Sequence, residues 1–481
     1  MPGTINLLSA LAAVFLLAAL WLYRINKSMQ AVPEEAAKAF PGHWSSEEIR
    51  ETYERLKKTP TDFAKHLPPK LDRRYVVFGG AGMVGGDIVL QLLLRGQSPE
   101  SIRIVDFQLL NRRDMLEKAA PCDFVKADMT SLASVEAAFS KEWPASVAKK
   151  PLTVYHTAAM IQPGDRSERL YERIRRVNVD GTANVMRAAK GAGADIFVAT
   201  SSASVSYIPA DVWVWPWQSI PGNYFHVASE ADFFKPIRPH NRFFANYSRS
   251  KAEGERLVCG ANHESFRTGT IRPGNGIYGQ KTDPILGSLL KMGDSATWIP
   301  HIIQDFVDSR NVALAHLFFE AALAQKAMPA CAGRPFVVTD PGPPVAFADM
   351  YKLVTELSTT PVSVLIVPPV ALLIVAHLIE AYISVVTRFP SLTATLGLKE
   401  PSYPINFLQP SVIRGSMHIL VDDSAAKKSA KEGGIGYHGV CNSLEGFCEE
   451  LLEWNREHED AQPTKPKVVE ALGKKAKGLG A

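Results

Sequence analysis

Apolar residues recur along the chain in two alternating patterns, short β-rich runs and longer repeats at helical spacing. The short runs lie at 74–78, 102–105, 124–127, 154–159 and 197–199. Strands that alternate with helices are typical of a doubly wound parallel sheet, in which ligands bind at the C-terminal ends of the strands. The pattern therefore predicts an α/β fold of Rossmann type.

A longer apolar run near the N-terminus has the length of a membrane span. Its 19 residues, 5–23, carry no charged side chain, and about 20 are needed to cross a bilayer core. Trp21 and Tyr23 stand where an interfacial aromatic belt would lie, and Arg24 follows at once. We expect residues 1–25 to form an uncleaved transmembrane anchor, with everything after Arg24 in the cytosol.

A second apolar stretch, 361–386, differs from the first. Pro368 and Pro369 interrupt it, and His377 and Glu380 lie inside the remainder. A span here would carry the C-terminal part of the fold away from the catalytic part. We therefore expect this stretch to form a helix that lies on the bilayer surface or packs against the substrate site.

Two polar segments flank the folded part. Residues 26–72 are predicted to be a juxtamembrane spacer, in which Ser45 and Glu48 form a capping box for a short helix ending near Lys58. The Pro/Lys-rich end, 461–481, is predicted to be a basic tail that contacts anionic lipid.

Composition and charge exclude some classes of protein. With 481 residues, 46% hydrophobic and 21% charged, the chain can bury a large core in two or three units, and it is not disordered. The net charge of +4 and the lack of a basic, aromatic-interleaved stripe argue against nucleic-acid binding. The five cysteines show no metal-ligand spacing, so we expect buried thiols and no metal.

A glycine-rich segment joins the first run to the first helical repeat. Gly79, Gly82 and Gly85 follow the strand directly, with Met83 and Val84 at the start of the helix. Such glycines allow a tight turn and a close approach of backbone to pyrophosphate, which the helix N-terminus attracts. The alternative, a glycine-rich surface turn, does not account for the strand and the helix on either side.

Two carboxylates are placed where they can contact the adenosine part of a dinucleotide. Asp106 ends the second run, 21 residues beyond Gly85, where it can accept hydrogen bonds from an adenosine ribose, and this favours NAD. Arg112 and Arg113 leave NADP as the alternative. Asp128 ends the third run and is expected to meet the adenine.

The fourth run ends in small residues, and these are expected to line the floor of the cofactor site. They are Thr157, Ala158 and Ala159.

Tyr247 and Lys251 are four residues apart and share one face of a helix. A free phenol has a pKa near 10. A cation ~4 Å away at a dielectric of ~20 is worth about 4 kcal/mol, or roughly three pKa units. The pair therefore suits a general base, and Ser202 at the end of the fifth run can hold the reacting oxygen.

In this order, the motifs resemble extended short-chain dehydrogenases/reductases, and among them the 3β-hydroxysteroid dehydrogenase family and its C4-decarboxylating sterol branch. The matching segments cover roughly 73–455. They are Gly79-x-x-Gly82-x-x-Gly85, Asp106-Phe107-Gln108, His156-Thr157-Ala158, Val177-Asn178-Val179-Asp180-Gly181-Thr182, Thr200-Ser201-Ser202-Ala203-Ser204-Val205, Tyr247-x-x-x-Lys251, Ile271-Arg272-Pro273, Asp305-Phe306-Val307, Asn311-Val312-Ala313-x-Ala315-His316 and Pro335-Phe336-Val337-Val338-Thr339-Asp340.

This resemblance implies a role for each residue of the site. Tyr247 would be the general acid/base, Lys251 would lower its pKa and hold the nicotinamide ribose, and Ser202 would bind the reacting oxygen. Asn178 would keep the proton-relay geometry, although a purely structural role is an equal alternative, and Pro273 would line the cofactor site. The activity implied is oxidation of a sterol 3β-hydroxyl, after which a β-keto acid can lose CO2.

The resemblance also implies an arrangement of domains and a location. We expect the NAD(P)-binding domain over 73–275 and a smaller substrate-binding lobe over 276–460. The enzyme would work at the endoplasmic reticulum membrane on a hydrophobic substrate, as a homodimer or within a membrane enzyme complex.

An insertion between Ser202 and Tyr247 departs from the family pattern. Trp213, Trp215 and Trp217 alternate in it, which predicts a strand or an extended lid with one aromatic face. The aromatic face would be core, or else a substrate lid or a membrane-dipping loop. The insertion leaves the sterol substrate in doubt.

Other functions share the same motifs. A ketoreductase of terpenoid or polyketide metabolism would use Tyr247, Lys251 and Ser202 as well. A non-catalytic, NAD-sensing membrane scaffold would not need them, and a sugar-nucleotide epimerase shares the fold but not the anchor.

Overall fold

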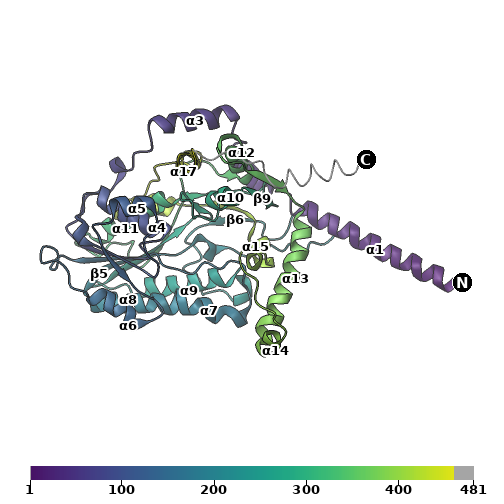
Figure 1. The fold of residues 1–481 in the computed structure, drawn as a ribbon, viewed down its shortest axis with the longest axis horizontal. Coiled ribbons are helices and arrows are strands. Elements are labelled where there is room, and N and C mark those ends of the chain that lie inside the picture. Colours follow the sequence, from purple (N-terminus) through teal and green to yellow (C-terminus); the bar gives the residue numbers. More distant parts are fainter. Residues whose placement is uncertain (1, 460–481) are drawn as a thin grey trace.

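A seven-stranded parallel sheet forms the centre of the protein (Figure 1). The structure is a computed structural model that describes residues 2–459, so the predicted basic tail lies outside the described residues. In spatial order the strands are β12 (Pro335–Val338), β7 (Arg267–Pro273), β5 (Ala194–Thr200), β4 (Leu152–His156), β1 (Arg74–Phe78), β2 (Ile102–Asp106) and β3 (Asp123–Lys126). All five predicted strands are present, and the Rossmann-type α/β fold is confirmed.

The chain reverses its winding between β1 and β4, and in open α/β sheets the ends of two such strands are where ligands bind. Helices cover both faces of the sheet (Figure 1). On one face lie α4 (Met83–Leu94), α5 (Arg113–Lys118) and α11 (Ser309–Leu323), and on the other α6 (Leu132–Ser140), α7 (Tyr171–Arg175), α8 (Thr182–Gly191) and α9 (Asn246–Gly260). A separate apolar cluster fills the space on each side, because the strands are buried on both faces.

A smaller lobe lies beyond the C-terminal ends of the strands. Its main sheet has the order β13 (Val345–Ala346), β10 (Ile303–Gln304), β15 (His418–Val421) and β6 (Phe225–Ala228), and two strand pairs are β8 (Ile277–Tyr278) with β11 (Val307–Asp308) and β9 (Asp294–Thr297) with β14 (Ser363–Ile366). Its helices are α10 (Leu286–Met292), α12 (Phe347–Leu357), α15 (Pro410–Gly415) and α17 (Ser443–Glu457), whereas α16 (Ser424–Lys427) packs against β12 of the large sheet.

The two units exchange segments across the boundary expected after residue 275. The strand β6 precedes that boundary yet belongs to the lobe sheet, and α11 and β12 follow it yet belong to the large sheet. The chain therefore crosses between the units more than once, and the ends of the large sheet are held against the lobe.

The segment 26–72, predicted to be a spacer, is folded onto the lobe. It contains α2 (Glu34–Ala39) and α3 (Ser46–Lys58), and the Ser45 hydroxyl accepts a hydrogen bond from the backbone N–H of Glu48 at 3.0 Å, as the capping pattern predicts. The side chains of Ile49 and Leu56 are buried in the lobe core. The sequence did not reveal this packing because α3 is charged over most of its surface.

Two helices are long and apolar enough to cross a membrane, by length and composition alone. They are the part of α1 (Pro2–Ser28) from Leu7 onward and α13 (Pro369–Arg388). In Figure 1, α1 projects away from the body, whereas α13 runs along its edge, across the direction of α1, and leads into α14 (Pro390–Thr395).

The tryptophan-rich insertion is a loop and not the strand that the alternation suggests. Val212 and Val214 point into the core, and Trp213, Trp215 and Trp217 point outward with exposed fractions of 42%, 64% and 75%. The alternative of an aromatic core is therefore wrong. An isolated bridge between Asp211 and Gly222 closes the loop, which leaves too few paired residues for a strand.

Candidate active site

The glycine-rich turn is packed so closely that side chains do not fit at two of its positions. Gly79 has a φ of +88°, and a Cβ there would lie 2.5 Å from the backbone N of Ala158. A Cβ at Gly85 would lie 2.2 Å from the carbonyl oxygen of Gly79 and 2.7 Å from Oγ1 of Thr157. Helix α4 begins at Met83, followed by Val84, with Gly82 as its N-cap, so its first amides face the turn. A phosphate group fits this cradle.

The acidic residue at the end of β2 is held beside the same turn. Asp106 accepts hydrogen bonds from the backbone N–H of Ala81 and of Gln108, each at 3.0 Å, and it is half-buried. This is the position from which a carboxylate binds an adenosine ribose and repels a 2′-phosphate.

Neither neighbouring arginine is free for such a phosphate. The Arg112 guanidinium is buried and donates to Asp87 and Asp114, at 2.6 Å each, and to the carbonyl oxygen of Met83. Arg113 pairs with Glu117 on the surface. The residues present fit NAD better than NADP.

Loops after β3 and β4 complete the cofactor side of the cleft. The Thr157 hydroxyl lies 3.1 Å from the carbonyl oxygen of Gly79, and Ala158 and Ala159 follow it, partly buried. Asp128 is half-buried, and its carboxylate accepts two hydrogen bonds from Thr130 in a local turn. Pro273 ends β7 and is fully buried.

Asn178 fixes the loop that follows β4. Its amide oxygen accepts from the backbone N–H of Met160 at 2.8 Å, and its amide nitrogen donates to the Met160 carbonyl at 3.0 Å and to Oγ of Ser250 at 2.9 Å. Asn178 lies in a π-helical turn, Arg176–Gly181, and such turns are frequent at functional sites. These bonds show a positioning role, and a role in proton relay stays a prediction.

Tyr247 lies in the first turn of α9 and faces the end of β5. Ser202 lies two residues beyond the end of β5, and its hydroxyl donates to Oγ of Ser204 at 2.8 Å. Burial raises the pKa of Tyr247 to about 12, while the neighbouring Ser202 side chain lowers it. The two hydroxyl groups predicted to bind one reacting oxygen are therefore brought together.

The ammonium group of Lys251 is directed elsewhere. Its Nζ donates to the carbonyl oxygen of Thr200 at 2.6 Å, and burial lowers the pKa of Lys251 to about 8. Lys251 therefore does not lower the pKa of Tyr247 in this structure, contrary to the expectation. Burial is the main cause of the pKa shift of both side chains. A cavity of about 20 Å³ lined by Lys251, Asn178 and Thr200 is large enough for one water molecule.

A phosphate cradle, a ribose-binding carboxylate and a Ser–Tyr–Lys set at the C-terminal ends of one parallel sheet define a dinucleotide-binding protein of the short-chain dehydrogenase type. The chain belongs to the 3-beta hydroxysteroid dehydrogenase/isomerase family, whose family model matches residues 76–367, more than half of the chain. The predicted family and class of enzyme are confirmed at this level.

Named relatives agree with this assignment. A decarboxylating sterol-4-alpha-carboxylate 3-dehydrogenase of Schizosaccharomyces pombe is 29% identical over 281 residues, which cover 57% of this chain and 72% of the relative. A 3beta-hydroxysteroid-dehydrogenase/decarboxylase of Arabidopsis thaliana is 28% identical over 426 residues, which cover 83% of this chain and 84% of the relative.

A solved structure shares the fold. The UDP-glucose 4-epimerase of Brucella ovis in complex with NAD superposes with a TM-score of 0.53 at 14% identity, over 79% of this chain and 98% of that one. At this identity the likeness shows the fold alone.

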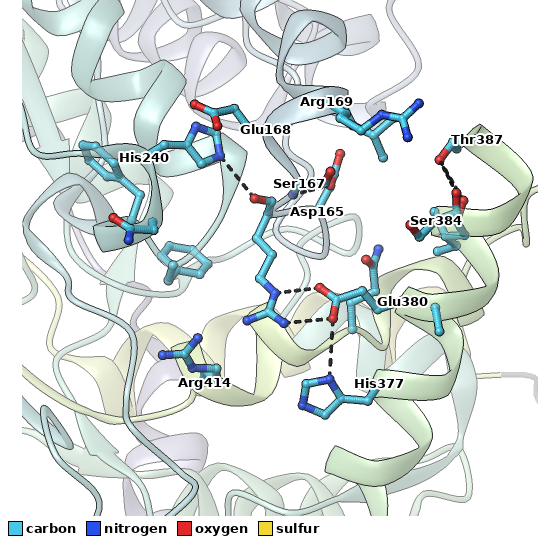
Figure 2. Close-up of a pocket in the computed structure, with 18 of the residues that line it drawn as sticks. Asp165, Ser167, Glu168, Arg169, His240, His377, Glu380, Ser384, Thr387 and Arg414 are labelled. Atoms are coloured by element: carbon cyan, nitrogen blue, oxygen red, sulfur yellow. Dashed lines mark hydrogen bonds and ion pairs between the residues drawn. The ribbon is translucent and has the colours of Figure 1, made fainter. Parts of the chain in front are cut away.

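A cavity of about 960 Å³ lies beside α13 and does not include Tyr247 or Ser202 (Figure 2). Its polar centre is the ion pair between Arg166 and Glu380. Sequence reasoning noticed Glu380 only as an interruption of an apolar stretch, and it missed Arg166. The partner of Glu380 is 214 positions away, and no local pattern reveals such a pair.

All five cysteines are buried and unpaired, as predicted. Among residues 2–459, no group of three or more His, Cys, Asp or Glu side chains is arranged to hold a metal ion.

Proposed function

We propose that the protein is a membrane-anchored, NAD-dependent dehydrogenase that oxidises the 3β-hydroxyl of a sterol or similar polycyclic alcohol. The observation that carries this proposal is the meeting of Tyr247 and Ser202 at the end of β5, beside the Gly79–Gly85 turn, in a member of this family. The names of the relatives add the sterol substrate class.

Each residue has a definite task in this proposal. Tyr247 accepts the hydroxyl proton of the substrate, and Ser202 donates a hydrogen bond to the same oxygen. Bound NAD supplies a nicotinamide ring that accepts a hydride from the carbinol carbon. Lys251 stabilises the phenolate once its ammonium turns from the Thr200 carbonyl toward the ribose and Tyr247.

The residues around the turn would hold the cofactor. The Gly82–Gly85 segment would bind the pyrophosphate, Asp106 the adenosine ribose and Asp128 the adenine. Thr157, Ala158 and Ala159 would form the floor of the site, and Pro273 would line it.

Loss of CO2 is the finer part of the proposal. A carboxyl group on C4 becomes a β-keto acid once C3 is oxidised, and it can leave without a further catalytic residue. The support for this step is the name of the Schizosaccharomyces pombe relative.

The membrane part of the proposal rests on α1 and α13. Residues 7–28 have the length of a span, and residues 7–21 are exposed. Arg24 and Lys27 near their end favour a cytosolic catalytic domain. The outward face of α13 is apolar at Ile374, Val375, Leu378, Tyr382 and Val385. A helix that crosses the direction of α1 along the edge of the domain suits the plane of the bilayer surface (Figure 1). We assign the endoplasmic reticulum as the membrane.

Incubation with a 4-carboxysterol and NAD tests the proposal. We expect NADH, a 3-ketone and CO2 in equal amounts. A sterol without the carboxyl group should give NADH and the ketone without CO2. A chain that reduces terpenoid or polyketide ketones with a reduced cofactor, and oxidises no 3β-hydroxysterol, would be the ketoreductase instead.

A further inference from the structure

The cavity of about 960 Å³ lies between one helix and two loops of the catalytic domain. One wall is α13, with His377, Glu380, Ala381, Ile383, Ser384 and Thr387. The opposite wall is formed by the segments 165–170 and 239–244 (Figure 2). Its volume is at the upper end of the range of about 300–1,000 Å³ for small-molecule sites.

The lining of the cavity is amphipathic. Arg166 reaches Glu380 with two hydrogen bonds, Nε to Oε1 at 2.6 Å and the terminal nitrogen to Oε2 at 2.8 Å, and His377 lies 3.5 Å from the same carboxylate. Phe243, Phe244 and Ile383 contribute apolar surface. Most of the other lining residues are polar or charged, among them Asp165, Arg169 and Arg414, so the cavity accepts an amphipathic molecule with its polar groups toward these side chains.

The catalytic-domain wall of the cavity is fastened to the first turn of α9. The backbone N–H of Asn246 donates to the Asp165 carbonyl at 2.7 Å, and the Asn246 amide donates to the Ser167 carbonyl at 2.8 Å. His240 bonds the Arg166 carbonyl at 3.1 Å. Because Tyr247 is the next residue after Asn246, the wall of the cavity is joined to the helical turn that carries Tyr247.

The other side of α13 faces away from the protein. Leu378 and Val385 have exposed fractions of 66% and 49% there. The helix is also joined to the anchor, because the Val370 N–H donates to Oδ1 of Asn26 at 3.3 Å and α1 packs against α13. One helix thus separates the cavity from the surface that is continuous with α1.

From this arrangement we infer that the cavity is the port through which the hydrophobic substrate leaves the bilayer and reaches Tyr247. The helix α13 lies in the bilayer surface and forms the lipid-side wall of the port. The Arg166–Glu380 ion pair holds this wall to the catalytic domain. The inference rests on the proposed function, since it names the route of that substrate.

Narrowing the port tests the inference with the full-length chain in phospholipid nanodiscs that carry a 3β-hydroxysterol. Ala381 is exposed and lines the cavity, so Ala381→Trp should raise the KM for the bilayer-borne sterol at least tenfold. The KM for NAD and the melting temperature should stay unchanged. Ala394→Trp is the matched control, because Ala394 is an equally exposed alanine of α14 outside the cavity lining. An unchanged sterol KM in Ala381→Trp, or an equal rise in both variants, overturns the inference.

Photolabelling gives a result that does not depend on turnover. A diazirine-bearing sterol in the nanodisc, with NAD present, should label peptides that contain residues 165–170 or 381–387. Labelling confined to α1 overturns the port. A diazirine-bearing phospholipid is the second probe. If it labels the cavity and excess sterol does not displace it, the cavity is a lipid site and the inference is overturned. A chain that is labelled as expected but oxidises no 3β-hydroxysterol would keep the port and lose the proposed function.

Discussion

Tyr247 and Lys251 are ionisable side chains whose pKa values burial moves toward the neutral form. The pKa of Tyr247 rises to about 12, and that of Lys251 falls to about 8. In the proposed mechanism Tyr247 acts as the general base, which requires a lower pKa than it has in this structure. Lys251 therefore has to leave the Thr200 carbonyl and approach the phenol. The pKa values of these two side chains therefore determine how the proposed proton transfer depends on pH.

Replacement of Tyr247 by Phe removes the proton acceptor and keeps the ring. We expect kcat to fall by roughly 10²–10⁴, the usual contribution of general acid–base catalysis. The affinity for NAD, measured by calorimetry, should not change. Tyr403→Phe, at an exposed tyrosine in the lobe, should leave both quantities unchanged. A Tyr247→Phe variant with normal kcat would contradict the assigned role.

The lowered pKa of Lys251 predicts how stability depends on pH. The unfolded chain binds this proton up to its ordinary value of 10.5, and the folded chain releases it near 8. Unfolding therefore takes up a proton between these values, so the free energy of unfolding contributed by this group rises with pH across the window. Lys251→Met should show a smaller rise in urea unfolding at pH 8, 9 and 10. Equal slopes for the two proteins would contradict the burial of a charged Lys251.

The residues of the site could be predicted from the sequence where they belong to a local sequence motif. The glycines, Asp106 and the Tyr247–Lys251 pair each have a fixed spacing from a strand or a helix. The direction of the Lys251 ammonium and the capture of Arg112 by Asp87 could not be found. Both depend on partners that only the folded chain brings near.

The unit formed by β1, its turn and α4 is the element on which cofactor binding depends. Gly85 lies where α4 crosses the turn, and any Cβ there would overlap the Gly79 carbonyl. The helix can approach the turn this closely only because residue 85 has no side chain.

Gly85→Ala should push α4 away from the turn at a cost of about 1–3 kcal/mol. The affinity for NAD should fall at least about tenfold, which corresponds to about 1.4 kcal/mol. Gly191→Ala is the control, because a Cβ at Gly191 meets no atom within 4 Å. Titration calorimetry of both variants would contradict the account if Gly85→Ala bound NAD as tightly as Gly191→Ala.

Helices and strands were predicted well where the hydrophobic periodicity was strong. They were predicted poorly where tertiary contacts determine the conformation or the burial of a segment. The strands of the central sheet are continuous apolar runs, and these are visible in the sequence. The burial of Ile49 in the lobe was hidden because one apolar stripe on a charged helix resembles a solvated helix. The alternating tryptophans suggested a strand, but their rings lie outside the core, where Trp215 stacks on Trp217 and Trp213 contacts Trp21.

At the scale of the whole molecule, the anchor is clamped to the domain. Trp21 donates from Nε1 to the Val214 carbonyl at 2.9 Å, and its ring packs at a tilt against Trp213, with ring centroids 5.6 Å apart. Ile25 and Met29 at the end of α1 are buried in the lobe core. Under the proposed function, this contact of α1 with the domain would fix the orientation of the catalytic domain and of α13 relative to the bilayer.

Two truncations separate the anchor from its clamp. Removal of residues 1–19 leaves the clamp intact and should change the free energy of unfolding by less than about 0.5 kcal/mol. Removal of residues 1–32 also deletes Ile25 and Met29, each worth about 1.5–3 kcal/mol when buried, so the loss should be about 3–6 kcal/mol. Chemical unfolding in the same detergent measures both, and equal stability of the two truncations would show that the clamp contributes nothing.

Transfer of a deuterium atom tests the central claim most directly. A 4-carboxysterol that carries deuterium on the carbinol carbon C3 is incubated with the full-length protein and NAD, and the reduced cofactor is weighed by mass spectrometry. The account predicts NADH that is heavier by one deuterium with the natural chain and none with Tyr247→Phe at equal NAD occupancy. Unlabelled NADH, or labelled NADH formed equally fast by Tyr247→Phe, would contradict it.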